Sequence, residues 1–139
     1  MWIQREIKLQ RRARGFHLVT DEIVNQLPEL TSVDVGMCNI FLHHTSASLT
    51  INENADPTVR EDFESYFQRS VLEDEPYYKH TYEGSDDLPA HIKSSILGCS
   101  INIPVTNGKL NLGTWQGIYL GEHREQASFR HVIVTINGG

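Results

Sequence analysis

Histidines and carboxylates crowd the stretch "HTYEGSDDLPAH", which covers residues 80–91. The residues there that could bind a metal are His80, Glu83, Asp86, Asp87 and His91. Imidazole nitrogens and carboxylate oxygens are donors that bind divalent metals in proteins. Asp87 and His91 are four residues apart, so on a helix they share one face. The stretch indicates a divalent metal site, and helix capping by the aspartates is the structural alternative.

Two further histidine groups lie in other parts of the chain. The stretch "FLHHTSAS" carries His43 and His44 in tandem at the end of an apolar run. Because side chains of a strand alternate between faces, only one of these two histidines can face the same side as Leu42. The stretch "GTWQGIYLGEHR" ends on His123 and Arg124. Taken alone, each group is explained by polar residues at a strand end, but together the three stretches could form one metal site with open positions.

The same stretches carry groups suited to binding a phosphate. A helix that begins near Asp87 would present its first backbone N–H groups to an anion. Lys93, Ser94, Ser95 and Arg124 could add charged and hydroxyl donors to the phosphate oxygens. No serine has a base assigned to it by sequence, and neither an H-E-x-x-H motif nor a phosphate-binding loop of the G-x-x-x-x-G-K-[ST] type is present. The residues therefore favour metal and phosphate chemistry over a nucleophilic triad.

Composition restricts the class of protein. The chain has 139 residues, which is the size of one domain, and we expect residues 1–139 to form a single one. Its formal net charge of −6 argues against general nucleic-acid binding, which requires a basic face. No apolar run approaches the roughly 18 residues of a membrane span, so we expect no membrane partner. Cys38 and Cys99 are too few for a disulfide framework and predict buried, reduced thiols in a cytoplasmic protein.

Period-two patterns predict strands over residues 2–12, 32–44 and 45–52, with Ile7 and Leu9 on one face of the first. A short helix is expected between the first two, with Thr20 as its N-cap and its end before Pro28. A longer helix is expected after the third strand. Asp56 is its N-cap, Pro57 its first residue, and its core face carries Val59, Phe63, Phe67 and Val71.

The second half of the chain is predicted to be a loop, a helix and three strands. The loop covers residues 72–85, and the helix runs from about Asp87 to Leu97 with Gly98 just beyond its end. Strands are expected over residues 99–105, 109–123 and 129–136, the first two joined by a turn at Asn107-Gly108. The order of elements predicts an α+β fold, mainly an antiparallel β-sandwich with two or three short helices.

Three motifs in this sequence resemble a known family. They are "HTSASLTINENADP" at 44–57, "EGSDDLPAHIKSSILG" at 83–98 and "GKLNLGTWQGIYLGEHR" at 108–124. Together with the segments between them they are similar to the YjbQ family, whose members are identified as secondary thiamine-phosphate synthases. The resemblance covers nearly the whole chain. It implies a YjbQ-like α+β sandwich and a homotrimer.

The resemblance also implies a histidine-lined metal site. Carried onto this sequence, the metal ligands are His44, His91 and His123, with His80 as a doubtful fourth. The implied metal is divalent, with zinc favoured by the histidines and magnesium possible.

The implied activity is that of a transferase. A pyrimidine diphosphate loses pyrophosphate and is joined to a thiazole phosphate. We expect Lys93, Arg124, Asp87 and Glu83 to serve catalysis, by stabilising the leaving group or fixing a histidine tautomer. The residues expected to bind substrate are Thr45, Ser46, Ser94, Ser95 and Gln116.

Two other functions stay open. One is a metal-dependent hydrolase of a small ester or phosphoester, because three histidines suit zinc better than magnesium. The other is a non-enzymatic trimer that binds a metal or another ligand. An open coordination position beside basic residues would favour an enzyme, and a closed set of four ligands that includes His80 would favour a structural metal.

Overall fold

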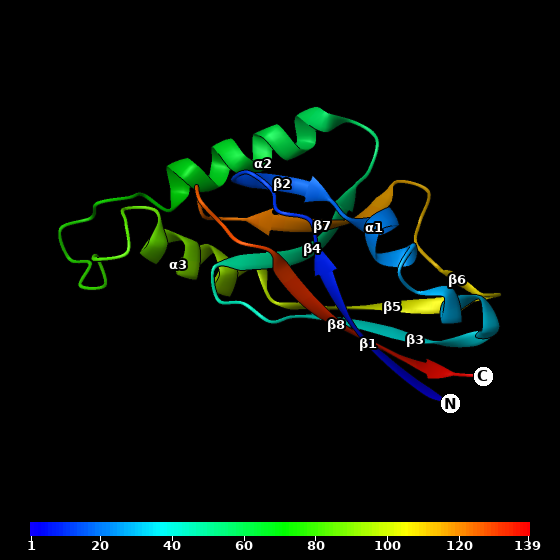
Figure 1. Cartoon of the computed structure of the whole chain (residues 1–139). Helices are drawn as coiled ribbons and strands as arrows, with labels where there is room; N and C mark the ends of the chain where they lie inside the picture. The colour runs from blue at the N-terminus through cyan, green and yellow to red at the C-terminus, as the bar shows by residue number, and fades with distance from the viewer.

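Two antiparallel sheets face each other in the computed structural model, which describes residues 1–139 (Figure 1). The larger sheet has the strand order β1-β8-β3-β5-β6, and the smaller has the order β2-β7-β4. The strands are β1 (Trp2–Leu9), β2 (Gly15–Leu18), β3 (Val35–Leu42), β4 (Ala47–Glu53), β5 (Ser100–Thr106), β6 (Lys109–Leu110), β7 (Gln116–Glu122) and β8 (Arg130–Gly138). This arrangement confirms the predicted α+β fold with mainly antiparallel sheets.

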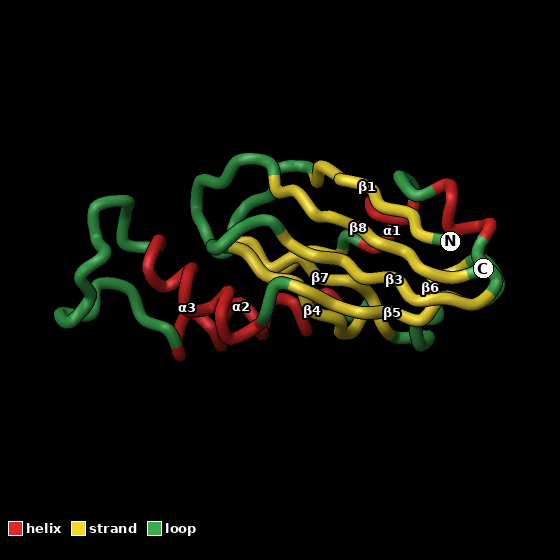
Figure 2. Tube along the Cα trace, turned by 90° about the horizontal axis from the view of Figure 1, so that it is seen from below, coloured by secondary structure: helices red, strands yellow, loops and turns green.

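Four helices accompany the two sheets. They are α1 (Thr20–Val24), the 3₁₀ helix η1 (Pro28–Ser32), α2 (Pro57–Ser70) and α3 (Asp87–Leu97). Figure 2 shows α2, α3 and the long loop after α2 at one end of the molecule, while the two chain termini lie side by side at the other. No helix of the chain has the length and apolar character required to cross a lipid bilayer.

The core lies between the sheets because each strand alternates apolar and polar residues. In β1, Ile7 and Leu9 are buried as the pattern predicts. In β3, Cys38 and Ile40 face the core, whereas Met37 points to the outer surface of the larger sheet. The smaller sheet contributes residues of β4 and β7 to the same core. The hydrophobic effect of this burial holds the two sheets together.

A second, smaller apolar contact lies on the outer side of the smaller sheet. Phe16 of β2 packs against Phe63 and Phe67 of α2, with ring centroids 5.6 and 5.9 Å away. Tyr119 of β7 also contacts Phe63, at 5.9 Å. Asp56 caps α2 by accepting a hydrogen bond from the N–H of Thr58 (2.9 Å). The predicted apolar face of α2 therefore packs on the outside of the smaller sheet, away from the main core.

Several local predictions were wrong. Thr20 is the first residue of α1 instead of its N-cap, because its hydroxyl accepts a hydrogen bond from the N–H of Ile118 on β7. The strand expected over 109–123 is two strands in different sheets, interrupted at residues 111–115. Cys38 is buried, and burial raises its thiol pKa to about 11, but Cys99 is exposed.

Candidate metal centre

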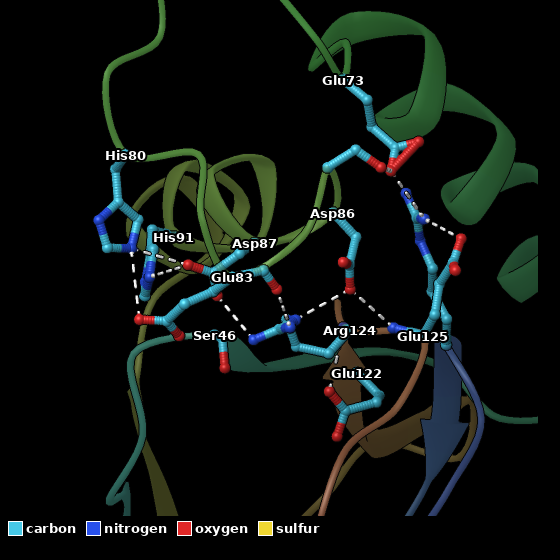
Figure 3. A network of polar contacts seen from close by, with 12 residues as sticks. Ser46, Glu73, His80, Glu83, Asp86, Asp87, His91, Glu122, Arg124 and Glu125 are labelled. Atoms are coloured by element: carbon cyan, nitrogen blue, oxygen red, sulfur yellow. Dashed lines mark hydrogen bonds and ion pairs between the residues drawn. The ribbon is translucent and has the colours of Figure 1, made fainter.

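Three ligand groups meet where the loop after α2 enters α3. His80 lies in the loop, and Asp87 and His91 lie one turn apart on α3. Their ligand atoms all lie within 4.8 Å of one another, and we call them the His–Asp cluster. Oδ2 of Asp87 is 2.8 Å from Nε2 of His80 and 3.2 Å from Nε2 of His91 (Figure 3). Both histidines are partly exposed, so the cluster is open to solvent on one side.

The backbone of Thr45 fixes the tautomer of His91. Nδ1 of His91 lies 2.9 Å from the carbonyl oxygen of Thr45, which can only accept a hydrogen bond. Nδ1 therefore carries a proton, and in the neutral ring Nε2 carries a lone pair. This lone pair faces the carboxylate oxygen of Asp87, which repels it unless a proton or a metal ion lies between them. Such second-shell hydrogen bonds are characteristic of histidines that bind metals.

Arg124 holds the two adjacent aspartates from the end of β7. Its Nε donates to Oδ2 of Asp86 (2.9 Å) and its Nη1 donates to Oδ1 of Asp87 (2.7 Å). Its Nη2 donates to the carbonyl oxygen of Glu83 (2.9 Å). Burial opposes ionisation of Asp86, but hydrogen bonds from the Glu125 N–H and from Arg124 outweigh it and hold the Asp86 pKa below its usual range. The second oxygen of Asp87 is left for the two histidines.

These contacts correct the interpretation of the aspartates as helix caps. Asp86 occupies the N-cap position of α3, yet its side chain makes no capping hydrogen bond. The carboxylates of Asp86 and Asp87 are instead used by Arg124 and the histidines. Arg124 and the histidines therefore account for the two adjacent aspartates, and helix capping accounts for neither side chain.

The structure does not bring His44, His91 and His123 together, and only His91 belongs to the His–Asp cluster. Nε2 of His44 accepts a hydrogen bond from the N–H of His131 (2.9 Å). Burial, with a contribution from the nearby Arg130, lowers the pKa of His44. His80, which the sequence suggested only as a doubtful fourth ligand, is a member of the His–Asp cluster. The spacing of His80, Asp87 and His91 over twelve residues was the sequence signal for this set.

His123 is fully buried behind β7. Its Nε2 lies 2.8 Å from Oγ of Ser48 on the neighbouring strand β4. Burial and the positive charge of Lys93 lower its pKa to about 3. The ring is therefore neutral at ordinary pH and lies apart from the His–Asp cluster.

The expected catalytic residues do not all meet at the His–Asp cluster. Asp87 is in the His–Asp cluster, and Oε1 of Glu83 lies at its edge, 4.0 Å from Nε2 of His80. Lys93 is two residues from His91, so it points to the opposite side of the helix, where it is fully buried. Arg124 is occupied by Asp86 and Asp87, which makes it a residue that positions the site.

The expected substrate-binding residues are also dispersed. Thr45 contacts the cluster only through its carbonyl oxygen, and Ser95 donates its hydroxyl to the His91 carbonyl oxygen (3.0 Å). Ser46 accepts a hydrogen bond from Arg130 (3.0 Å), which is paired with the buried Glu122. Gln116 lies at the start of β7, at the far end of the strand from Arg124. Ser94 is buried on α3.

Comparison with known proteins identifies the family. The family model described as UPF0047 protein YjbQ-like matches residues 5–139. The chain is 54% identical over 138 residues to UPF0047 protein YjbQ of Escherichia coli O157:H7, covering 99% of each chain, and 55% identical to its namesake in Salmonella typhimurium over the same length.

Solved structures agree with this match. A YbjQ-like protein of unknown function from Sulfolobus solfataricus superposes with a TM-score of 0.86 at 28% identity, covering 100% of this chain and 99% of that one. A yjbq/upf0047 family protein from Clostridium acetobutylicum gives a TM-score of 0.80 at 38% identity, covering 97% and 99%. The chain therefore belongs to the YjbQ (UPF0047) family.

Proposed function

We propose that this protein is a divalent-metal-dependent enzyme that acts on a phosphorylated small molecule. The observation that carries the proposal is the His–Asp cluster. There the Thr45 carbonyl oxygen accepts the Nδ1 proton of His91, which leaves the Nε2 lone pair facing Asp87. Three protein ligands leave coordination positions for a substrate, as in catalytic zinc sites. The partial exposure of His80 and His91 gives a small molecule access to those positions.

The donor set favours zinc over magnesium. Two imidazoles and one carboxylate form a set found in catalytic zinc sites, whereas magnesium prefers oxygen ligands and retains several waters. Asp87 would supply the carboxylate, oriented by Arg124 through its other oxygen. The outer partners of the cluster, the Thr45 carbonyl and Arg124, would hold His91 and Asp87 in place for an ion.

The candidate reaction is formation of thiamine phosphate from a pyrimidine diphosphate and a thiazole phosphate, as the family resemblance implies. A bound divalent ion would supply the positive charge that pyrophosphate needs in order to leave. Arg124 is paired with two aspartates, so in this proposal it orients Asp87. His80 and His91 would hold the ion, and Glu83 at the edge of the cluster would orient His80.

A metal-dependent hydrolase is the second candidate. The zinc-type donor set favours it, since zinc serves hydrolysis of esters and phosphoesters widely and magnesium is the usual ion for pyrophosphate departure. Both candidates place the substrate at the His–Asp cluster. They differ in the nucleophile, which is a second substrate in the transferase reaction and water in the hydrolysis.

Metal content of the purified protein tests the proposal. We expect close to one transition metal per chain, measured by elemental analysis of protein prepared without chelator. His80→Ala, Asp87→Ala and His91→Ala should each lose most of it, because each removes one of three ligands. His17→Ala is the matched control, since His17 bonds only the carbonyl oxygen of Ala13.

Two further variants distinguish the His–Asp cluster from the set implied by the resemblance. His44→Ala and His123→Ala should keep their metal if the cluster is the site. Loss of metal in these two, with retention in His80→Ala, would contradict the cluster. Metal-loaded protein would then be assayed with the two thiamine precursors and with a phosphomonoester, to separate transferase from hydrolase activity.

The proposed enzyme is a homotrimer, as the resemblance implies. The outer surface of the larger sheet supports self-association because it exposes Trp2, Met37 and Phe41, which are 74%, 47% and 42% exposed. Trp2 and Met37 both align with Asn137 of β8, so they lie in one row across the sheet. Exposed apolar patches of this kind are typical of interaction surfaces.

A further inference from the structure

Arg14 lies in the segment between β1 and β2 and is paired with three carboxylates from other segments. Its Nε lies 3.4 Å from Oε2 of Glu64 on α2, and its Nη1 lies 3.6 Å from Oε1 of Glu73 in the loop after α2. Nη1 also lies 3.3 Å from Oε1 of Glu125, which follows β7. The side chain of Arg14 is only 13% exposed. One guanidinium therefore joins α2, the loop after it and the residues after β7.

Two of these contacts lie at the ends of the loop after α2. Glu73 lies near the start of the loop, and its Oε1 accepts a hydrogen bond from the hydroxyl of Ser85 near the end (3.3 Å). The backbone N–H of Glu125 donates to Oδ2 of Asp86, the residue after Ser85 (2.9 Å). Figure 3 shows Glu73 and Glu125 on one side of Asp86 and the His–Asp cluster on the other. Arg14 therefore contacts the residues that hold the two ends of the loop.

The loop after α2 decides where His80 lies relative to its two partners. Asp87 and His91 are one turn apart on α3, so the helix itself fixes their spacing. His80 is outside the helix, and its Nε2 lies 2.8 Å from Oδ2 of Asp87 only in the conformation that the loop adopts. Its side chain is partly exposed, so packing in the core does not hold it. Contacts that fix the two ends of the loop therefore restrict the position of His80.

Electrostatic repulsion would act on these segments without Arg14. Glu64, Glu73 and Glu125 share this guanidinium, and none of them forms an ion pair with another residue. Like charges that meet at one point repel each other. Exposed ion pairs contribute little to stability because water screens them, but Arg14 is mostly buried and belongs to a network, so its pairs are screened less. Loss of its charge should therefore loosen the loop.

We propose that Arg14 is a positioning residue for the metal centre, because it holds the loop after α2 in the conformation that brings His80 to Asp87. This inference rests on the proposed metal-dependent function and adds a residue that controls how tightly the ion is held. The carboxylates that Arg14 contacts all lie outside the His–Asp cluster, so it acts on a metal ion only through the loop. Residues outside the ligand set change metal affinity by factors of about 10–100.

Titration of the metal-free full chain with cobalt(II), followed by visible absorption, tests the inference. Arg14→Met should weaken cobalt binding by about tenfold, the lower end of that range, because Arg14 acts through an intervening loop. Arg14→Lys keeps the charge without the planar guanidinium, so its affinity should lie between that of Arg14→Met and that of the unaltered protein. Arg12→Met is the matched control, since the only carboxylate paired with Arg12 is that of Glu22 (2.7 Å) and the Arg12 side chain is 19% exposed.

The double variant Arg14→Met/His80→Ala shows whether Arg14 acts through His80. If it does, replacing Arg14 should have little further effect on cobalt affinity once His80 is absent, because residues that act together are not additive. A further tenfold loss of affinity in the double variant would overturn the inference, since Arg14 would then act without His80. Glu73→Gln removes the loop's charge at a partly exposed position and should also weaken cobalt binding, so it decides the matter should Arg14→Met fail to fold.

Limited proteolysis with trypsin gives a readout that needs no metal. Lys79 is exposed inside the loop, and cleavage after it should be faster in Arg14→Met than in Arg12→Met, because loosened segments are cut more readily. Equal cleavage rates or equal cobalt affinities in these two variants would overturn this inference and leave the metal centre intact. Absence of cobalt binding in the unaltered protein would overturn the metal centre, and this inference with it.

Discussion

Two histidines of this protein, His91 and His123, are held in different ways by their surroundings. His91 has its Nδ1 proton held by the carbonyl oxygen of Thr45, which leaves Nε2 as a potential ligand. His123 has the same side chain but is fully buried beside Lys93, and its pKa is lowered to about 3. A hydrogen bond fixes the tautomer of His91, whereas burial keeps His123 neutral inside the protein.

Acid should weaken the fold through His123. In the unfolded chain its pKa is about 6.5. Below that pH the unfolded state therefore binds a proton at this histidine that the folded state does not bind. Stability therefore falls as the pH is lowered from about 6.5 towards 3, by about 1.4 kcal/mol per pH unit from this group. Urea unfolding at several pH values between 6.5 and 4 measures the effect.

The variant His123→Gln isolates this contribution. Glutamine does not titrate and can still bond Oγ of Ser48, so its free energy of unfolding should fall less steeply with acid. His17→Gln is the control and should follow the unaltered protein. Equal slopes for the His123→Gln variant and the unaltered protein would contradict the assigned role of burial.

At the scale of elements, β7 and the residues after it contribute to separate contacts and hydrogen-bond networks. Its outer face supplies Tyr119 to the contact with α2, and the residues just beyond its end supply His123 and Arg124 to different networks. Successive residues of an extended chain point to opposite sides, so His123 turns towards Ser48 of β4 and Arg124 towards the aspartates of α3. Helix α3 divides in the same way between His91 and Lys93.

Gly121 allows β7 and β4 to hold the bond between Ser48 and His123. A Cβ atom at this position would lie 2.4 Å from Oγ of Ser48 and 2.9 Å from the His123 ring. Gly121→Ala should therefore destabilise the fold by about 1–3 kcal/mol, the usual cost of overpacking a buried site.

Chemical denaturation of Gly121→Ala measures that loss. Gly139→Ala is the control, because nothing lies within 4 Å of a Cβ placed there. Both variants exchange glycine for alanine, so the difference between them reports the steric contact. A stability for Gly121→Ala equal to that of the control would show that Ser48 and His123 move aside without cost.

At the scale of the whole molecule, the outer surface of the larger sheet exposes the apolar side chains of Trp2, Met37 and Phe41. Met37 aligns with Asn137 of β8 and Pro104 of β5, in a row without charge. Phe41 aligns with Ile133 and Ser100 in another row. The row through Met37 is neutral, and the row through Phe41 ends on Glu6 of β1. Exposed apolar side chains of this kind suit contact with another copy of the chain.

Met37→Glu should shift the proposed trimer towards monomers, because it places a charge in the middle of this surface. Light scattering coupled to size-exclusion chromatography measures the mass in solution. Tyr66→Glu is the control, since Tyr66 is exposed on α2. A mass unchanged by Met37→Glu would place the contact between subunits on another surface.

Much of this architecture follows from sequence patterns alone. Alternation along β1 and β3 places Ile7 and Cys38 inside, and the Asp56-Pro57 pair marks the start of α2. These features are local, because strand alternation and helix capping depend on neighbouring residues. The same local signals predict the α+β class and the density of metal-binding residues between 80 and 91.

Tertiary structure alone decided which of those residues meet. Asp86 and Asp87 have the sequence of helix caps, yet Arg124, some 37 residues away, uses both carboxylates. The tautomer of His91 depends on a backbone carbonyl of another segment, which no side-chain pattern encodes. Lys93 was expected to serve catalysis, but it is fully buried on α3, which packs against β4. Long-range contacts such as these depend on how elements pack, so the sequence determined the candidate groups and the fold determined their partners.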